Sequence, residues 1–123
     1  MSESITVTLP LPPEPLYPNK RIRNCYGISR LVASTRAAAK LLVGLELPSD
    51  WTPPAAVKIA ATFHMPRKRD ADNLLAWAKH HFDGAAEAIG INDACFQHEM
   101  PKQVTGKAAG GERKLILEIR RLA

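Results

Sequence analysis

The segment AAVKIAATFHMPRKRDADNLLAWAK, from Ala55 to Lys79, contains a strand, a turn and a helix start around which the rest of the chain can be arranged. Its first eleven residues alternate between two faces, which predicts a half-buried β-strand. Four apolar residues share one of these faces: Val57, Ile59, Ala61 and Phe63. Pro66 ends the strand, and a helical pattern of apolar residues begins after Asp70 and Asp72. The two acidic residues therefore lie at a strand-to-helix junction.

Charge of both signs is concentrated at this junction, because Arg67, Lys68 and Arg69 directly precede Asp70 and Asp72. One aspartate is explained as an N-cap, since its carboxylate accepts hydrogen bonds from the first turn of the helix. A second acid beside three cations favours a site that holds a divalent cation next to a polyanion, because hard cations prefer carboxylate oxygens. Without a cation the acids would repel each other and any nucleic acid.

The predicted second helix can be divided into faces at about 100° per residue. Lys79 and Asp83 each lie about 20° from the direction of Asp72, so the three charges share one side. The core stripe lies on another arc and consists of Leu74, Leu75, Ala78, Phe82, Ala85 and Ile89. The alternative is an exposed Lys79 and Asp83 pair, worth a few tenths of a kcal/mol. Gly90 ends the helix and places Asp93 in a helix-to-strand loop, where a turn role is its alternative.

The remaining segments complete an α+β pattern in a single domain, residues 1–123. Strands are predicted at Ser4 to Leu9, Phe96 to Met100 and Lys114 to Arg120, and a first helix at Leu31 to Leu45. The segment PLPPEPLYP, residues 10–18, is predicted to be a rigid, extended surface loop, with an SH3-type ligand as the alternative. VTGKAAGGE, residues 104–112, is predicted to be a flexible hairpin loop. We expect a mixed β-sheet packed with two main helices.

Composition limits the classes of partner. The chain has 123 residues, of which 46% are hydrophobic and 24% charged, as expected for one globular domain. A net charge of +5 favours an acidic partner, with nucleic acid ahead of an anionic membrane. Cys25 and Cys95 form no disulfide or zinc-ribbon spacing, and adjacent His80 and His81 cannot chelate one metal from a helix. The absence of a signal peptide and of a long apolar run predicts a cytoplasmic protein that is not in a membrane.

These residues resemble the RusA family of Holliday junction resolvases, in its shorter phage and prophage form. The resemblance covers nearly the whole chain. It comprises the N-terminal strand with its proline-rich LPLPPEPLYPNKR segment and the block RDADNLLAWAKHHFDGAAEAIGIND, residues 69–93. The D-x-D-N-L motif and the later D-G and N-D pairs are its most specific elements.

The resemblance implies a Mg²⁺-dependent endonuclease that acts as a homodimer and cuts four-way DNA junctions symmetrically, with Mn²⁺ as a substitute ion and no small-molecule cofactor. Asp70, Asp72 and Asp93 match the catalytic, metal-binding carboxylates of the family, and Lys79 matches its helix lysine. Lys79 lies one helical turn later than in the cellular members. Asn73 and Asp83 are additional candidates for the site.

Six basic residues are the predicted DNA contacts: Arg67, Lys68 and Arg69 beside the acids, and Lys20, Arg21 and Arg23 after the proline segment. Arg120 and Arg121 are expected to contribute little. Two alternatives remain open on the sequence. One is a catalytically inactive module that binds branched DNA, in which the acids act only as caps. The other is a nuclease for other branched or flapped DNA.

Overall fold

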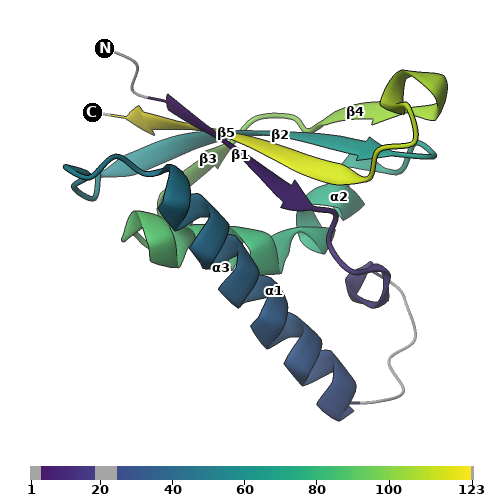
Figure 1. Ribbon diagram of the computed structural model, residues 1–123, viewed down its shortest axis with the longest axis horizontal. Coiled ribbons are helices and arrows are strands. Elements are labelled where there is room, and N and C mark those ends of the chain that lie inside the picture. Colours follow the sequence, from purple (N-terminus) through teal and green to yellow (C-terminus); the bar gives the residue numbers. More distant parts are fainter. Residues whose placement is uncertain (1–3, 19–24, 123) are drawn as a thin grey trace.

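The computed structural model describes residues 4–18 and 25–122, which form an α+β fold with one mixed β-sheet (Figure 1). The strands are β1 (Ser4–Pro10), β2 (Ala56–Met65), β3 (Phe96–His98), β4 (Lys102–Thr105) and β5 (Lys114–Leu122). The α-helices are α1 (Cys25–Glu46), α2 (Ala71–Trp77) and α3 (Lys79–Ile89). Three short 3₁₀ turns complete the fold, η1 (Glu14–Leu16), η2 (Asp93–Cys95) and η3 (Gly106–Ala109). The predicted fold class is therefore confirmed.

The sheet order is β1-β5-β2-β3, and β4 continues the pairing along β2 beyond the end of β3. β5 lies antiparallel to both of its neighbours, so that Leu117 pairs with Val7 on one side and with Ala61 on the other. β3 and β4 are parallel to β2. The chain returns from the end of β2 to the start of β3 through α2 and α3, as parallel strands require.

The core lies between the sheet and the helices, which cover one face of it in Figure 1. The alternation predicted for β2 is confirmed, because Val57, Ile59, Ala61, Phe63 and Met65 are all at most 3% exposed. α1 and α3 cross closely at Gly84. A Cβ atom at Gly84 would lie 2.3 Å from the Arg36 carbonyl oxygen and 2.9 Å from the Ala39 Cβ, so this crossing requires glycine.

The predicted single second helix is wrong in one respect, because it is two helices that meet at Ala78 (φ −87°, ψ 6°). The core stripe is retained across this break, with Leu74, Phe82 and Ile89 all buried. Backbone hydrogen bonds continue across the break, from the Ala78 N–H to the Leu74 carbonyl oxygen at 3.1 Å and from the Phe82 N–H to the Ala78 carbonyl oxygen at 3.0 Å. The angular argument that placed Asp72 on the same side as Lys79 and Asp83 assumed a single axis and therefore does not hold, whereas Lys79 and Asp83 do lie one turn apart on α3.

The prediction of a hairpin loop at residues 104–112 is also wrong, because the strand before it, β4, pairs with β2 and not with β5. The first two residues of the predicted loop belong to β4, and η3 follows. Gly106, Gly110 and Gly111 have φ values of 61°, 59° and 80°, and no atom lies within 4 Å of a Cβ built on any of them. The glycines are needed for these left-handed backbone angles and not for lack of space.

The proline segment packs against its own chain. The Trp77 indole Nε1–H donates to the Pro13 carbonyl oxygen at 2.8 Å, and His81 Nε2 lies 2.9 Å from the Pro10 carbonyl oxygen. The segment contains η1, followed by a bend at Tyr17 and a turn at Pro18, and is therefore not extended throughout. An SH3-type ligand would have to leave these contacts, which disfavours that alternative.

The described helices include none with the length and apolarity that a membrane crossing requires.

Candidate functional site

The candidate site begins at the end of β2, where Asp70 and Asp72 stand at the start of α2. Asp70 is the N-cap residue, and its Oδ1 accepts a hydrogen bond of 2.9 Å from the backbone N–H of Asp72. Asp72 occupies the first turn, and both aspartates are exposed. Asn73, the other candidate here, is half-buried. The capping interpretation is therefore confirmed for Asp70, while the carboxylate of Asp72 is presented to solvent beside it.

Arg69 has an internal role. Its Nη2 lies 3.0 Å from Glu14 Oε1, and its guanidinium carbon lies 4.5 Å and 4.8 Å from the ring centroids of Tyr17 and Trp77. The two rings contact each other, with centroids 5.3 Å apart, and an arginine over both of them and beside a carboxylate gains cation–π and charge-assisted contacts. These contacts join the proline segment to α2. Arg69 is half-buried by them, whereas Arg67 and Lys68 are exposed.

Gln103 on β4 holds the backbone of Arg69 and was not predicted as a site residue. The Arg69 N–H donates to Gln103 Oε1, and Gln103 Nε2–H donates to the Arg69 carbonyl oxygen, both at 2.8 Å. The side-chain amide of Gln103 thus makes the two backbone hydrogen bonds that a neighbouring strand would make with Arg69. Since a glutamine 34 positions away carries no local signal, only the fold identifies it.

Asp93 lies at the opposite end of the sheet. It opens η2, and three residues later Phe96 pairs with Val57 at the start of β2, whereas Asp70 follows the end of β2. A strand of ten residues spans roughly 30 Å. Within the described residues, no three His, Cys, Asp or Glu side chains are grouped so that they could hold a metal ion. One chain therefore brings Asp70 and Asp72 together but not Asp93.

The remaining candidates on α3 interact with each other. Lys79 Nζ lies 3.6 Å and His80 Nδ1 3.7 Å from Asp83 Oδ2. The Lys79 side chain is 65% exposed, so this pair matches the alternative of an exposed i, i+4 contact. Burial lowers the pKa of His80, although the Asp83 carboxylate acts in the opposite direction.

Burial also lowers the pKa values of two further histidines, His81 and His98. His81 is 1% exposed, and burial lowers its pKa to about 4 despite the contact with the Pro10 carbonyl. A neutral ring with its proton on Nε2 fits that contact. Burial also lowers the pKa of His98, whose ring lies 4.6 Å from that of Phe82, while Asp93 acts to raise it.

The three other predicted DNA contacts, Lys20, Arg21 and Arg23, lie outside the described residues. At the chain end, Arg121 donates to the Thr52 carbonyl oxygen at 2.6 Å and lies 5.0 Å from the Trp51 ring centroid. Both contacts attach β5 to the turn that precedes β2.

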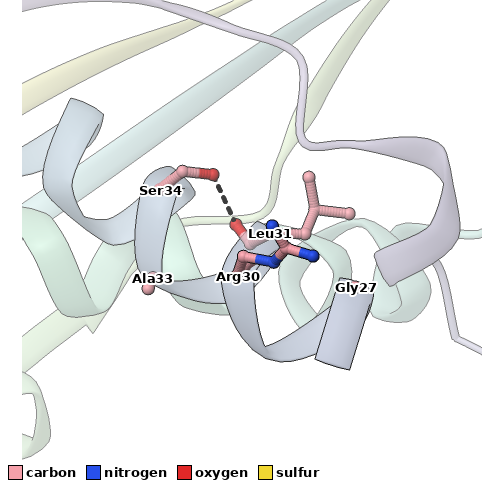
Figure 2. Close-up of a pocket in the computed structure, with 5 residues that line it drawn as sticks. All are labelled: Gly27, Arg30, Leu31, Ala33 and Ser34. Atoms are coloured by element: carbon pink, nitrogen blue, oxygen red, sulfur yellow. Dashed lines mark hydrogen bonds between the residues drawn. The ribbon is translucent and has the colours of Figure 1, made fainter. Parts of the chain in front are cut away.

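A shallow hollow on α1 is lined by Gly27, Arg30, Leu31, Ala33 and Ser34 (Figure 2). Ser34 Oγ–H donates to the Leu31 carbonyl oxygen at 3.1 Å, and Arg30 is exposed. The lining residues come from one helix, and none of the predicted site residues is among them.

No family model matches this sequence. An uncharacterized protein of Xylella fastidiosa (strain Temecula1 / ATCC 700964) is 32% identical over 99 residues, an alignment that covers 74% of this chain and 61% of the relative. The chain thus spans less than two thirds of that relative's length.

Two solved structures are distantly similar. The 2C-methyl-D-erythritol 2,4-cyclodiphosphate synthase of Plasmodium vivax has a TM-score of 0.36 and 14% identity, with 79% of this chain and 62% of that chain covered. The IspF of Plasmodium falciparum, in its CDP complex, has a TM-score of 0.34 and 10% identity, with 100% and 99% covered. Likenesses at these scores do not bear on the function.

Proposed function

We propose that this protein is a Mg²⁺-dependent endonuclease that resolves four-way DNA junctions, as the resemblance to the RusA family implies. The observation that carries the proposal is the pair of exposed carboxylates, Asp70 and Asp72, directly beside the exposed cations Arg67 and Lys68. The same loop thus offers hard oxygen ligands and positive charge for a phosphodiester backbone.

The donor set fits a hard divalent ion such as Mg²⁺ or Mn²⁺, because carboxylate oxygens are the preferred ligands of such ions. Asp70 and Asp72 would hold the ion. When bound, a divalent ion stabilises charge on the phosphate and lowers the pKa of a water molecule. Asp70 also accepts its capping hydrogen bond, which orients its carboxylate next to that of Asp72.

Asp93 enters this proposal through a second chain. Since one chain leaves Asp93 at the far end of β2, a homodimer would have to bring the Asp93 of one protomer to the Asp70 and Asp72 pair of the other. Symmetric cutting of two strands also calls for two sites related by a two-fold axis. We therefore propose that the homodimer is the active form.

The test is incubation of the purified protein with a synthetic mobile four-way junction whose strands are end-labelled one at a time, with Mg²⁺ and with EDTA. Paired, symmetric, Mg²⁺-dependent nicks support the proposal. Binding without nicks supports the inactive DNA-binding module. Faster cutting of flaps than of junctions supports the nuclease for other branched DNA.

A further inference from the structure

We infer that two loops at one end of the sheet together form a binding surface for the phosphate backbone of DNA. The surface consists of Arg67, Lys68, Lys107 and Arg113, and we call these four residues the basic rim. The inference rests on the proposed function for its choice of ligand, but it requires only binding and no cleavage. It adds Lys107 and Arg113 to the DNA contacts predicted from the sequence.

Backbone contacts place the two loops at the same end. β4 runs parallel to β2, so that Thr105 lies beside Met65, and the Gly106 N–H donates to the Pro66 carbonyl oxygen at 3.1 Å. At the other end of the loop, Lys114 pairs with His64. Residues 106–113 therefore lie next to residues 66–68, and Figure 1 shows this loop at the same end of the sheet as α2.

The charges of the basic rim are available to a ligand. All four side chains belong to exposed residues, and none of them makes an ion pair within residues 4–18 and 25–122. The one acid of the second loop, Glu112, is bound to Lys114 Nζ at 2.7 Å. Arg69, the remaining cation of the first loop, is held by Glu14. Four cations without an ion-pair partner among the described residues thus lie on two loops that meet at the end of β2.

The second loop is fixed in shape before any ligand binds. The Gly110 N–H donates to the Lys107 carbonyl oxygen at 3.1 Å, and the Glu112 N–H donates to the Ala109 carbonyl oxygen at 3.0 Å. Ala109 is 3% exposed and anchors η3 against the fold. An anchored loop loses little conformational entropy on binding, which favours affinity.

A second charged area is a weaker candidate for a polyanion. Lys58, Ala60, Glu99, Lys102, Glu118 and Arg120 line a hollow of about 200 Å³ on the sheet. Two of its cations already pair with acids, because Lys58 Nζ lies 3.4 Å from Glu99 and Arg120 Nη2 lies 3.9 Å from Glu118. The four cations of the basic rim, in contrast, make no ion pair within the described residues, and Glu112 beside them is paired with Lys114.

The experiment compares two double variants that remove the same charge. Lys107→Gln with Arg113→Gln removes two cations of the basic rim, and Arg30→Gln with Lys40→Gln removes two exposed cations of α1. Each variant lowers the formal net charge from +5 to +3, that is, by two units. Thermal unfolding followed by circular dichroism verifies that both remain folded, as expected for exposed substitutions.

Binding to a fluorescent 30-base-pair duplex and to a four-way junction is measured in EDTA over a series of salt concentrations. We expect the rim variant to flatten the slope of log affinity against log salt by about two units, because each lost phosphate contact removes about 0.9. The α1 variant should keep the wild-type slope. Equal slopes for the two variants, or a wild-type protein without salt-dependent DNA affinity, would overturn the inference.

A separate junction-cutting assay in Mg²⁺ distinguishes this inference from the proposed function. If the salt slope changes only in the rim variant and the wild type does not cut junctions, the basic rim is supported as a DNA-binding surface and the proposed nuclease function is rejected. Cutting by the wild type with an unchanged slope in the rim variant retains the nuclease and rejects the basic rim.

Discussion

Asp70 and Asp72 have different roles although only one residue separates them. Asp70 Oδ1 is engaged by the backbone of α2, so its carboxylate has a fixed direction. Asp72 is exposed beside it, and its carboxylate makes no such hydrogen bond within residues 4–18 and 25–122. In the proposed metal site, Asp70 would therefore supply a carboxylate of fixed direction and Asp72 one that can turn towards the ion.

Asp72→Asn should abolish junction cutting and preserve junction binding. The substitution keeps the shape of the side chain and removes one negative ligand, while metal-ion stabilisation of a transition state is worth several kcal/mol. Cutting is measured in Mg²⁺ and binding in EDTA. Asp70→Asn should behave alike, because asparagine is also a good N-cap. Asp50→Asn, another exposed aspartate, is the matched control and should cut normally. Near wild-type cutting by Asp72→Asn would falsify the metal-site assignment.

The buried imidazole of His81 should make the fold sensitive to mild acid. Its pKa is about 4 in the folded chain and near 6.5 when unfolded, so between these values the unfolded state binds the additional proton. Stability should therefore fall as the pH decreases from 6.5 towards 4, by up to about 3 kcal/mol. Urea unfolding at several pH values measures this.

His81→Gln removes the titration while keeping an N–H donor for the Pro10 carbonyl. This variant should lose much of the pH dependence of stability between pH 6.5 and 4. The pH dependence that remains should come from His80 and His98, whose pKa values are also lowered by burial. An unchanged pH dependence in His81→Gln would mean that other groups destabilise the fold in acid.

At the scale of elements, the strands with a two-residue period were predictable, and the irregular connections were not. β2 and β5 have alternating apolar residues that become buried, so sequence and structure agree within one or two residues. β4 has four residues and exists because it pairs with β2, which is a contact between distant segments. The break at Ala78 has no signal in the sequence either, since alanine favours an uninterrupted helix. Local pattern cannot report either feature.

In the candidate site too, some features were predictable from the local sequence and others depend on contacts between distant segments. The D-x-D-N-L motif identified Asp70 and Asp72, and the structure places them together at the start of α2. The contact of Gln103 with Arg69 depends on the β4 pairing and could not be predicted. The separation of Asp93 follows from the parallel crossover, because a helix that runs back between parallel strands puts its start and its end at opposite ends of the sheet.

Gln103→Ala should loosen the loop that carries Asp70. The substitution leaves the Arg69 N–H and carbonyl without their partners, at a cost of about 1–3 kcal/mol for unsatisfied buried groups. Hydrogen exchange of the Arg69 amide should accelerate, and half-saturation of cutting should require more Mg²⁺. Gln97→Ala on β3, at an exposed position, is the control. If Arg69 exchange does not change, Gln103 does not hold this loop.

At the scale of the whole molecule, we predict a homodimer. We expect the interface at the N-terminal strand β1 and its neighbours, because β1 is an edge strand in the sheet order of the described residues. Sedimentation at the concentrations used for cutting should give about twice the 13.5 kDa of one chain. A monomer that cuts junctions would contradict the prediction.

Complementation tests whether two chains share a site. Asp72→Asn and Asp93→Asn should each be inactive alone, but a mixture of them forms heterodimers in which one site has both native carboxylate sets. Such a site makes single nicks, so the mixture should nick junctions without cutting them in pairs. If the mixture is as inactive as its components, each site belongs to one chain. Cutting by Asp93→Asn alone would instead show that Asp93 has no role in the site.

The position of β5 in the sheet also affects how the protein is made. β1 and β2 are not neighbours, and each pairs with β5, which follows them in the sequence. On a ribosome that adds roughly 5–20 residues per second, β1 would wait on the order of ten seconds for its partner. During translation, therefore, the edges of β1 and β2 are exposed to chaperones, and to aggregation, until Lys114 to Leu122 leaves the exit tunnel.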